Sequence, residues 1–149
     1  MAKLPRVAQI AGVLMVLPFL WGALTQLDED AAALGSHFLG ARFIGPYIGL
    51  TWGTVVLAFQ SGILWTFASR AGRGSVIGSL LALIPAVWAF VMVGGGPVSA
   101  SINLMAGFVA LLVLDWSFWR WGVAPRWWMR FRLLPVSMIL ACLALTAFG

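Results

Sequence analysis

Four long windows of this 149-residue chain contain no charged residue, and they constrain the fold more than any other feature. The windows span 7–27, 43–69, 74–114 and 133–149, and the third is 41 residues long. A helix needs about 20 apolar residues to cross the hydrocarbon core of a membrane, so three windows fit one crossing each and the third fits two. The sequence therefore predicts an all-α integral membrane bundle of five transmembrane helices.

Composition excludes the common soluble classes. Only 9% of the residues are charged, whereas ordinary soluble domains carry about 25%. A chain with so few charges cannot cover a globular surface, which excludes a soluble enzyme and a nucleic-acid-binding domain despite the net charge of +5. The single cysteine, Cys142, excludes a disulfide framework and is expected to be a reduced packing residue.

The windows and their turn signals set the expected helix limits. We predict helices at about 7–24, 44–68, 76–93, 98–114 and 133–148 within a single transmembrane domain 1–149. Gly-Gly-Gly-Pro at 94–97 divides the longest window as a tight turn. Interfacial loops are expected at 28–43, with a short amphipathic helix over 31–41, and at 115–132. The first window also resembles a cleaved signal peptide, but it is long for one and acids follow it, so we favour a retained helix.

The basic residues predict the orientation. With a cytoplasmic N-terminus, eight of them fall on the inner side and only Arg42 falls on the outer side. This asymmetry follows the positive-inside rule and predicts an N-in/C-out topology. The excess of Arg over Lys is typical of GC-rich bacterial genomes, so we expect a multi-pass protein of a bacterial inner (cytoplasmic) membrane. The eight inner residues are Lys3, Arg6, Arg70, Arg73, Arg120, Arg126, Arg130 and Arg132.

Small residues recur at four-residue spacing in two predicted helices, which favours close helix packing within lipid. Gln60 lies on the same helical face as the glycines before it, so its amide is expected to meet a neighbouring helix. Pro18 and Pro85 should kink their helices and could open a cavity beside Gln60. The predicted packing positions are Gly45, Gly49 and Gly53 with Gln60, and Gly74 and Gly78.

Tryptophan and arginine alternate in the predicted inner loop. Trp rings favour the headgroup region and Arg binds phosphates, so this loop is expected to contact anionic lipid. The fifth window is short for a crossing, so Arg130 and Arg132 at its start should snorkel. Asp115 is the only acid on the inner side and can pair with Arg120 or Arg132. The predicted lipid-interface residues are Trp119, Arg120, Arg126, Trp127, Trp128, Arg130 and Arg132.

Three blocks of sequence resemble a family of small multi-pass membrane proteins of uncharacterised function that includes the animal mitochondrial transmembrane protein sixty-nine. The resemblance covers about 45–135 and implies the same multi-pass topology, but no activity. Leu64, Ser61, Gly78 and Leu83 depart from it, standing where relatives are expected to have His, Gly, Pro and Trp. The blocks comprise Tyr47, 57–59, Gly62 and Trp65, then Ser75, Val76 and Leu80, then Asp115, Pro125, Trp127, Trp128 and Arg132.

No catalytic, cofactor or metal site is predicted. His37 is the only histidine, and no second His or Cys lies near it in sequence, whereas a metal site needs three or four converging ligands. We therefore expect a protein that is not an enzyme and acts as an accessory or assembly subunit beside other membrane proteins. The alternatives are a small transporter or a lipid- or quinone-binding protein with a site near Gln60, Trp52 and Trp65, and an intramembrane enzyme.

Overall fold

The computed structural model describes residues 3–149, which form helices joined by turns and contain no strand. Five helices are long and apolar enough to cross a membrane, which confirms that part of the prediction. A shorter helix, α2, and two single turns of 3-10 helix, η1 and η2, lie in the connections. The elements are α1 (Arg6–Leu27), α2 (Glu29–Leu39), η1 (Ala41–Phe43), α3 (Gly45–Ser69), η2 (Gly72–Gly74), α4 (Ser75–Met92), α5 (Pro97–Arg120) and α6 (Trp128–Phe148).

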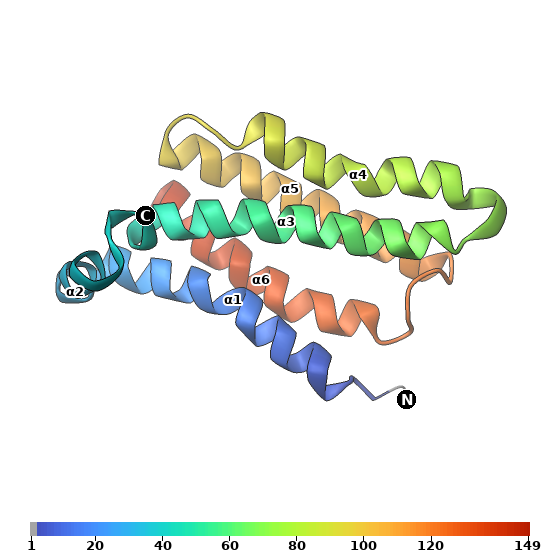
Figure 1. Cartoon of the computed structure of the whole chain (residues 1–149), viewed down its shortest axis with the longest axis horizontal. Helices are drawn as coiled ribbons and strands as arrows, with labels where there is room; N and C mark the ends of the chain where they lie inside the picture. The colour runs from blue at the N-terminus through green and yellow to red at the C-terminus, as the bar shows by residue number, and fades with distance from the viewer. Residues whose placement is uncertain (1–2) are drawn as a thin grey trace.

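The five long helices lie side by side along the long axis of the molecule (Figure 1). Helix α3 is central: α1 and α4 flank it in one layer, and α5 and α6 form a second layer behind. The described chain starts at one end of the bundle and ends at the other, as an odd number of passes requires. Each loop between consecutive long helices therefore lies at the end opposite to the loop before it.

The helix limits differ from the prediction mainly around the second expected loop. Helix α5 continues to Arg120, and α6 begins at Trp128, so only 121–127 connect them. The predicted loop 115–132 is too long, because a charged residue can remain inside a helix when a partner neutralises it. With 21 residues, α6 is about 31 Å long and can cross the hydrocarbon core without snorkelling by Arg132.

Proline lies inside three of the long helices, and side chains of α3 bond to the backbone near two of these sites. Pro18 in α1 and Pro85 in α4 each lack the N–H that would continue the helical hydrogen bonds. Trp52 Nε1 donates a hydrogen bond to the carbonyl oxygen of Met15, 2.9 Å away and three residues before Pro18. The Ser61 hydroxyl donates to the carbonyl oxygen of Ala82, three residues before Pro85. Side chains of α3 thus bond to backbone carbonyls about one turn before both prolines. The third proline, Pro135, lies within α6.

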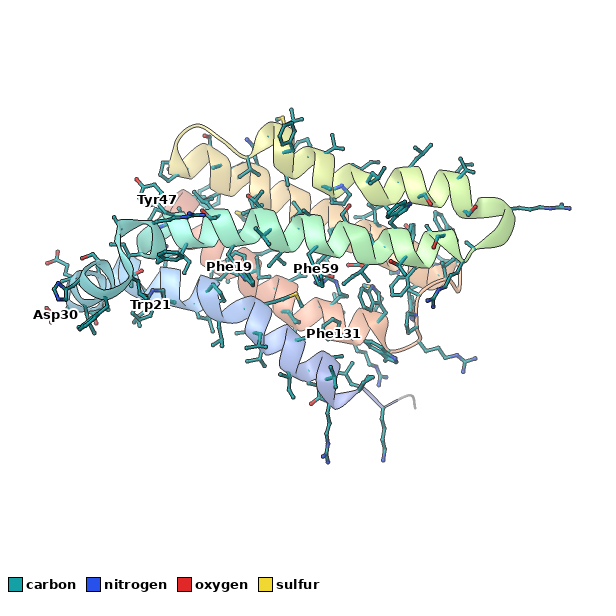
Figure 2. All side chains as sticks on the ribbon, in the orientation of Figure 1. Phe19, Trp21, Asp30, Tyr47, Phe59 and Phe131 are labelled. Carbon is teal, nitrogen blue, oxygen red and sulfur yellow. The ribbon has the colours of Figure 1, made fainter. Side chains whose placement is uncertain are left out.

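The core runs along the inner faces of all five long helices. Phe19 of α1 is fully buried and makes an edge-to-face contact with Phe108 of α5, with 6.3 Å between ring centres. Figure 2 shows Phe19 at the boundary between α1 and α3, and many other side chains project outward around the bundle. Large apolar residues are exposed on every long helix, as expected of a surface that faces lipid rather than water.

Helix α2 lies across the end of the bundle beside α1 (Figure 1). The Asp28 carboxylate caps its start by accepting hydrogen bonds from the backbone N–H groups of Asp30 and Ala31. Gly35 permits close packing, since a methyl group there would lie 2.7 Å from a side-chain atom of Ile44. Leu34 and Phe38 remain exposed, so α2 presents an apolar face beside its acidic first turn. This is the arrangement of a helix that lies in a membrane interface.

Candidate functional site

A buried polar cluster joins α5 to α6 near the end that holds the α5–α6 connection. The connection turns sharply because Gly122 adopts a left-handed conformation (φ +74°), and the N–H of Val123 bonds back to the carbonyl oxygen of Phe118. Helix α6 therefore returns antiparallel to α5. Trp128 and Arg132 are four residues apart and share one face of α6, which places both side chains against Asp115.

Asp115 accepts hydrogen bonds from both partners. Its Oδ1 atom is 2.7 Å from Trp128 Nε1, and its Oδ2 atom is 2.8 Å from Arg132 Nε. The side chains of Asp115 and Arg132 are only 1% and 2% exposed. The carboxylate neutralises the guanidinium where neither charge reaches solvent, so the cluster fixes how α5 and α6 meet.

Aromatic rings enclose the ion pair. The Arg132 guanidinium carbon lies 5.6 Å from the centre of the Trp128 ring, and Phe67 of α3 meets the same ring edge-to-face at 5.0 Å. The cluster therefore also connects the α5–α6 pair to α3. Arg132 Nη2 is buried, and no hydrogen-bond partner for it occurs within 3–149. The cluster thus holds three helices together, because Asp115 of α5 bonds to Trp128 and Arg132 of α6 and Phe67 of α3 packs on Trp128.

The structure separates the predicted lipid-interface residues into two groups. Trp128 and Arg132 are buried in the cluster and face neither lipid nor headgroups, which corrects their placement at the interface. The sequence did not predict this burial because both residues were expected in a loop. In a loop, residues four apart do not share a face, whereas in α6 they do. Asp115 pairs with Arg132 and not with Arg120. The Arg120 guanidinium lies over the Trp116 ring instead. The residues that reach the surface are Trp119, Arg120, Arg126, Trp127 and Arg130.

The predicted packing glycines also differ from one another. A methyl group at Gly53 would overlap the Leu104 side chain and lie 3.2 Å from Phe19, and one at Gly78 would lie 3.1 Å from Ala68 Cβ. These two positions therefore permit close approach of helices. The other three glycines do not mark a close approach of two helices. Gly45 begins α3 in a left-handed conformation, and a methyl group at Gly49 would make only ordinary contact with Phe19. Gly74 lies in η2 and faces open space.

Gln60 and Trp52 both bond to Met15 of α1, whereas Trp65 lies on the outside of the bundle. Gln60 is 1% exposed, and its Nε2 atom lies 2.8 Å from the sulfur of Met15. Trp52 bonds to the α1 backbone, whereas Trp65 is 53% exposed on the outside of the bundle. Gln60 Oε1 is buried without a hydrogen-bond partner within the described residues. Helix α3 thus contacts α1 and α4 about one turn before Pro18 and Pro85, through the hydrogen bonds of Trp52 and Ser61.

The remaining reactive side chains lie apart. His37 is exposed on α2 beside Phe38, and Cys142 is a half-buried free thiol on α6. Across residues 3–149, no three His, Cys, Asp or Glu side chains are close enough together to hold a metal ion.

An outward-facing strip of small residues on α3 was not anticipated from the sequence. Ala58, Gly62 and Thr66 follow one another at four-residue spacing, and all three are exposed. A methyl group at Gly62 would meet no atom within 4 Å. Exposed Phe59 and Trp65 lie beside the strip. Helix α3 therefore carries small residues on the inner face, where Gly53 packs, and again on the face that no other helix of the bundle covers. We call Ala58, Gly62 and Thr66 the α3 strip.

These features define a multi-pass, all-helical membrane protein whose interior polar groups join its helices. The chain belongs to the family described as "Protein of unknown function (DUF3429)", which matches residues 4–148. No curated protein and no solved structure matches the sequence significantly.

Proposed function

We propose that this protein is a non-catalytic accessory or assembly subunit that docks against a helix of a larger membrane complex. The observation that carries the proposal is the α3 strip, where Gly62 leaves open space on an exposed helical face. Lipid tails are as apolar as Leu side chains, so membrane helices associate chiefly through close packing at small residues. A strip of this kind on a lipid-facing surface suits the backbone of a partner helix.

The chemistry of the bundle interior supports the same proposal. Asp115 and Arg132 neutralise each other, and Trp52 and Ser61 bond to backbone carbonyls of α1 and α4. Polar side chains that are used in this way stabilise a fixed arrangement of helices. A fixed bundle with an open packing face on α3 suits a docking subunit.

We also propose a bacterial inner membrane as the location, with the N-terminus in the cytoplasm and the C-terminus outside. The start of α1, the α3–α4 turn and the α5–α6 connection lie at one end of the bundle (Figure 1). The basic residues of these segments therefore gather at that end, opposite the acidic first turn of α2. The three sequence blocks also predict a relationship to mitochondrial transmembrane protein sixty-nine, and this relationship stays a prediction.

Affinity purification from native membranes tests the docking role. The full-length chain is expected to recover a stoichiometric membrane partner, and Gly62→Leu is expected to lose it, because a bulky side chain fills the strip. The matched control is Val87→Leu on α4, a 57% exposed position that we assign to lipid, and it should retain the partner. Recovery of the same partner by Gly62→Leu, or of none by the unaltered chain, would contradict the proposal.

A further inference from the structure

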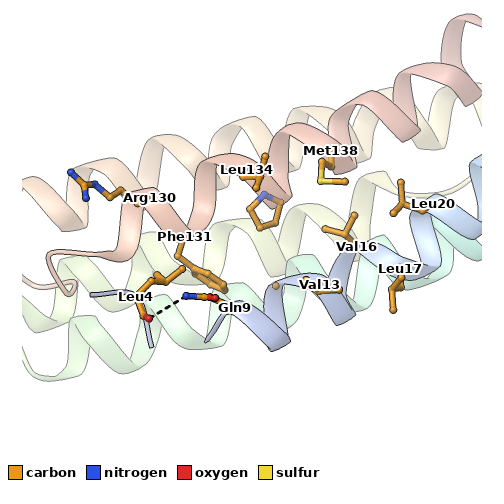
Figure 3. Close-up of a pocket in the computed structure, with 12 residues that line it drawn as sticks. Leu4, Gln9, Val13, Val16, Leu17, Leu20, Arg130, Phe131, Leu134 and Met138 are labelled. Atoms are coloured by element: carbon orange, nitrogen blue, oxygen red, sulfur yellow. Dashed lines mark hydrogen bonds between the residues drawn. The ribbon is translucent and has the colours of Figure 1, made fainter. Parts of the chain in front are cut away.

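A long groove lies between α1 and α6, separate from the α3 strip. Its volume is about 390 Å³, and its sides are formed mainly by exposed or half-buried apolar side chains. Helix α1 supplies Val13, Val16, Leu17 and Leu20, and α6 supplies Leu134 and Met138. Gly12 lies where the two helices approach, since a methyl group there would be 3.0 Å from the Phe131 ring. Figure 3 shows this apolar stretch running along both helices.

One end of the groove is polar and basic. Arg130 and Gln9 line this end together with Leu4 (Figure 3). The Gln9 amide donates a 3.3 Å hydrogen bond to the Leu4 carbonyl oxygen, which ties the segment before α1 to the groove. Exposed Lys3 and Arg6 flank Leu4 in the chain. Both α1 and α6 begin at this end, so their dipoles add partial positive charge to it. The groove is thus apolar along its length and cationic at one end.

The length of the groove and the charge at its end indicate which occupant fits. From Gln9 to Leu20, α1 rises about 16 Å. A groove of about 390 Å³ along that length has room for one extended hydrocarbon chain. The cationic end then selects a lipid whose headgroup is an anion.

We propose that this groove binds one anionic phospholipid from the leaflet at the N-terminal side of the bundle. One acyl chain lies along Val13 and Leu17, and the phosphate lies at Arg130. Bulk lipid also surrounds the protein, so burial of the chain alone gives little selectivity. Selectivity for the anionic headgroup comes from the guanidinium, whose N–H groups match phosphate oxygens. If the proposed N-in orientation holds, this leaflet is the cytoplasmic one.

Native mass spectrometry of the detergent-purified full chain tests the site. The probes are phosphatidylglycerol and phosphatidylcholine with identical acyl chains. The unaltered protein is expected to retain one phosphatidylglycerol in preference to phosphatidylcholine. Arg130→Gln should weaken phosphatidylglycerol binding about tenfold and remove the preference, because a charge-assisted hydrogen bond is lost. Val13→Phe should weaken binding of both lipids by filling the groove. Val13 is 61% exposed, so this change should leave the fold intact.

Two matched controls separate the site from general effects. Arg73→Gln removes a charge from η2, and Val87→Phe enlarges an exposed residue of α4, so neither touches the groove and both should bind as the unaltered protein does. Leu17→Phe repeats the groove-filling test if Val13→Phe folds poorly. Equal retention of the two lipids by the unaltered chain, or equal behaviour of Arg130→Gln and Arg73→Gln, would overturn the proposal. Groove binding of a neutral quinone in place of phosphatidylglycerol would also overturn it.

Discussion

Replacing Asp115 with Asn removes the carboxylate that neutralises Arg132 while preserving the shape of the side chain. The amide oxygen can still accept the Trp128 indole hydrogen bond, so the change acts chiefly on the Arg132 charge. That guanidinium is 2% exposed and cannot reach solvent without moving α6. Removing one partner of a buried ion pair costs about 3–5 kcal/mol. We therefore expect Asp115→Asn to lower the free energy of unfolding by that amount.

The double variant Asp115→Asn with Arg132→Gln separates the charge effect from packing. It removes both charges, and the two amides can still form one hydrogen bond. Its expected cost is about 1–2 kcal/mol, which is less than that of Asp115→Asn alone. The second substitution thus partly rescues the first. This sign distinguishes an ion pair from two residues that contribute independently.

Equilibrium unfolding in mixed micelles, followed by tryptophan fluorescence, measures these free energies. Arg120→Gln is the control, because Arg120 is exposed and its guanidinium carbon lies 4.9 Å from the centre of the Trp116 ring. Its expected cost is below about 1 kcal/mol. If the double variant were as unstable as the sum of the two single variants, the Asp115–Arg132 pair would not hold α5 to α6 as argued.

Three further predictions follow from the packing and the topology. Gly53→Ala should lower the free energy of unfolding by about 1–3 kcal/mol through overlap with Leu104. A methyl group at Gly62 faces open space, so Gly62→Ala should leave the free energy of unfolding unchanged or raise it by up to about 1 kcal/mol in the same assay. Ser61→Ala should cost about 1 kcal/mol by removing the hydrogen bond to the Ala82 carbonyl oxygen, whereas Ser99→Ala, an exposed control, should cost less. In a Cys142→Ser background, an impermeant maleimide should label Ser36→Cys on intact cells and Ser69→Cys only after permeabilisation; the reverse pattern would invert the orientation.

Charge spacing predicted the number of long helices because each crossing needs an uninterrupted apolar window. The ends of α5 and α6 lie outside the predicted limits, since Asp115 and Arg132 lie inside helices and not in a loop. Their pairing depends on a turn at Gly122 that brings the two helices back together. The four-residue spacing of Trp128 and Arg132 indicates that both side chains share one helical face. This holds only if both residues lie in the same helix, as they do in α6.

Small-residue spacing was informative about packing but not about which face packs. Gly53 and Gly78 lie against neighbouring helices, whereas Gly62 faces outward on the same helix as Gly53. A single helix can carry small residues on two faces, and only the positions of its neighbours tell which face is covered. The groove between α1 and α6 is likewise a product of helix arrangement, because Leu17 and Met138 are far apart in sequence.

Site-specific photo-crosslinking in native membranes tests the docking role most directly. A photoreactive residue at position 62 should form a discrete adduct with one membrane protein, because the α3 strip is where a partner helix would lie. The same residue at position 87 of α4 should give lipid adducts only. Lipid adducts alone at both positions would contradict the proposal that this protein docks to a larger complex through α3.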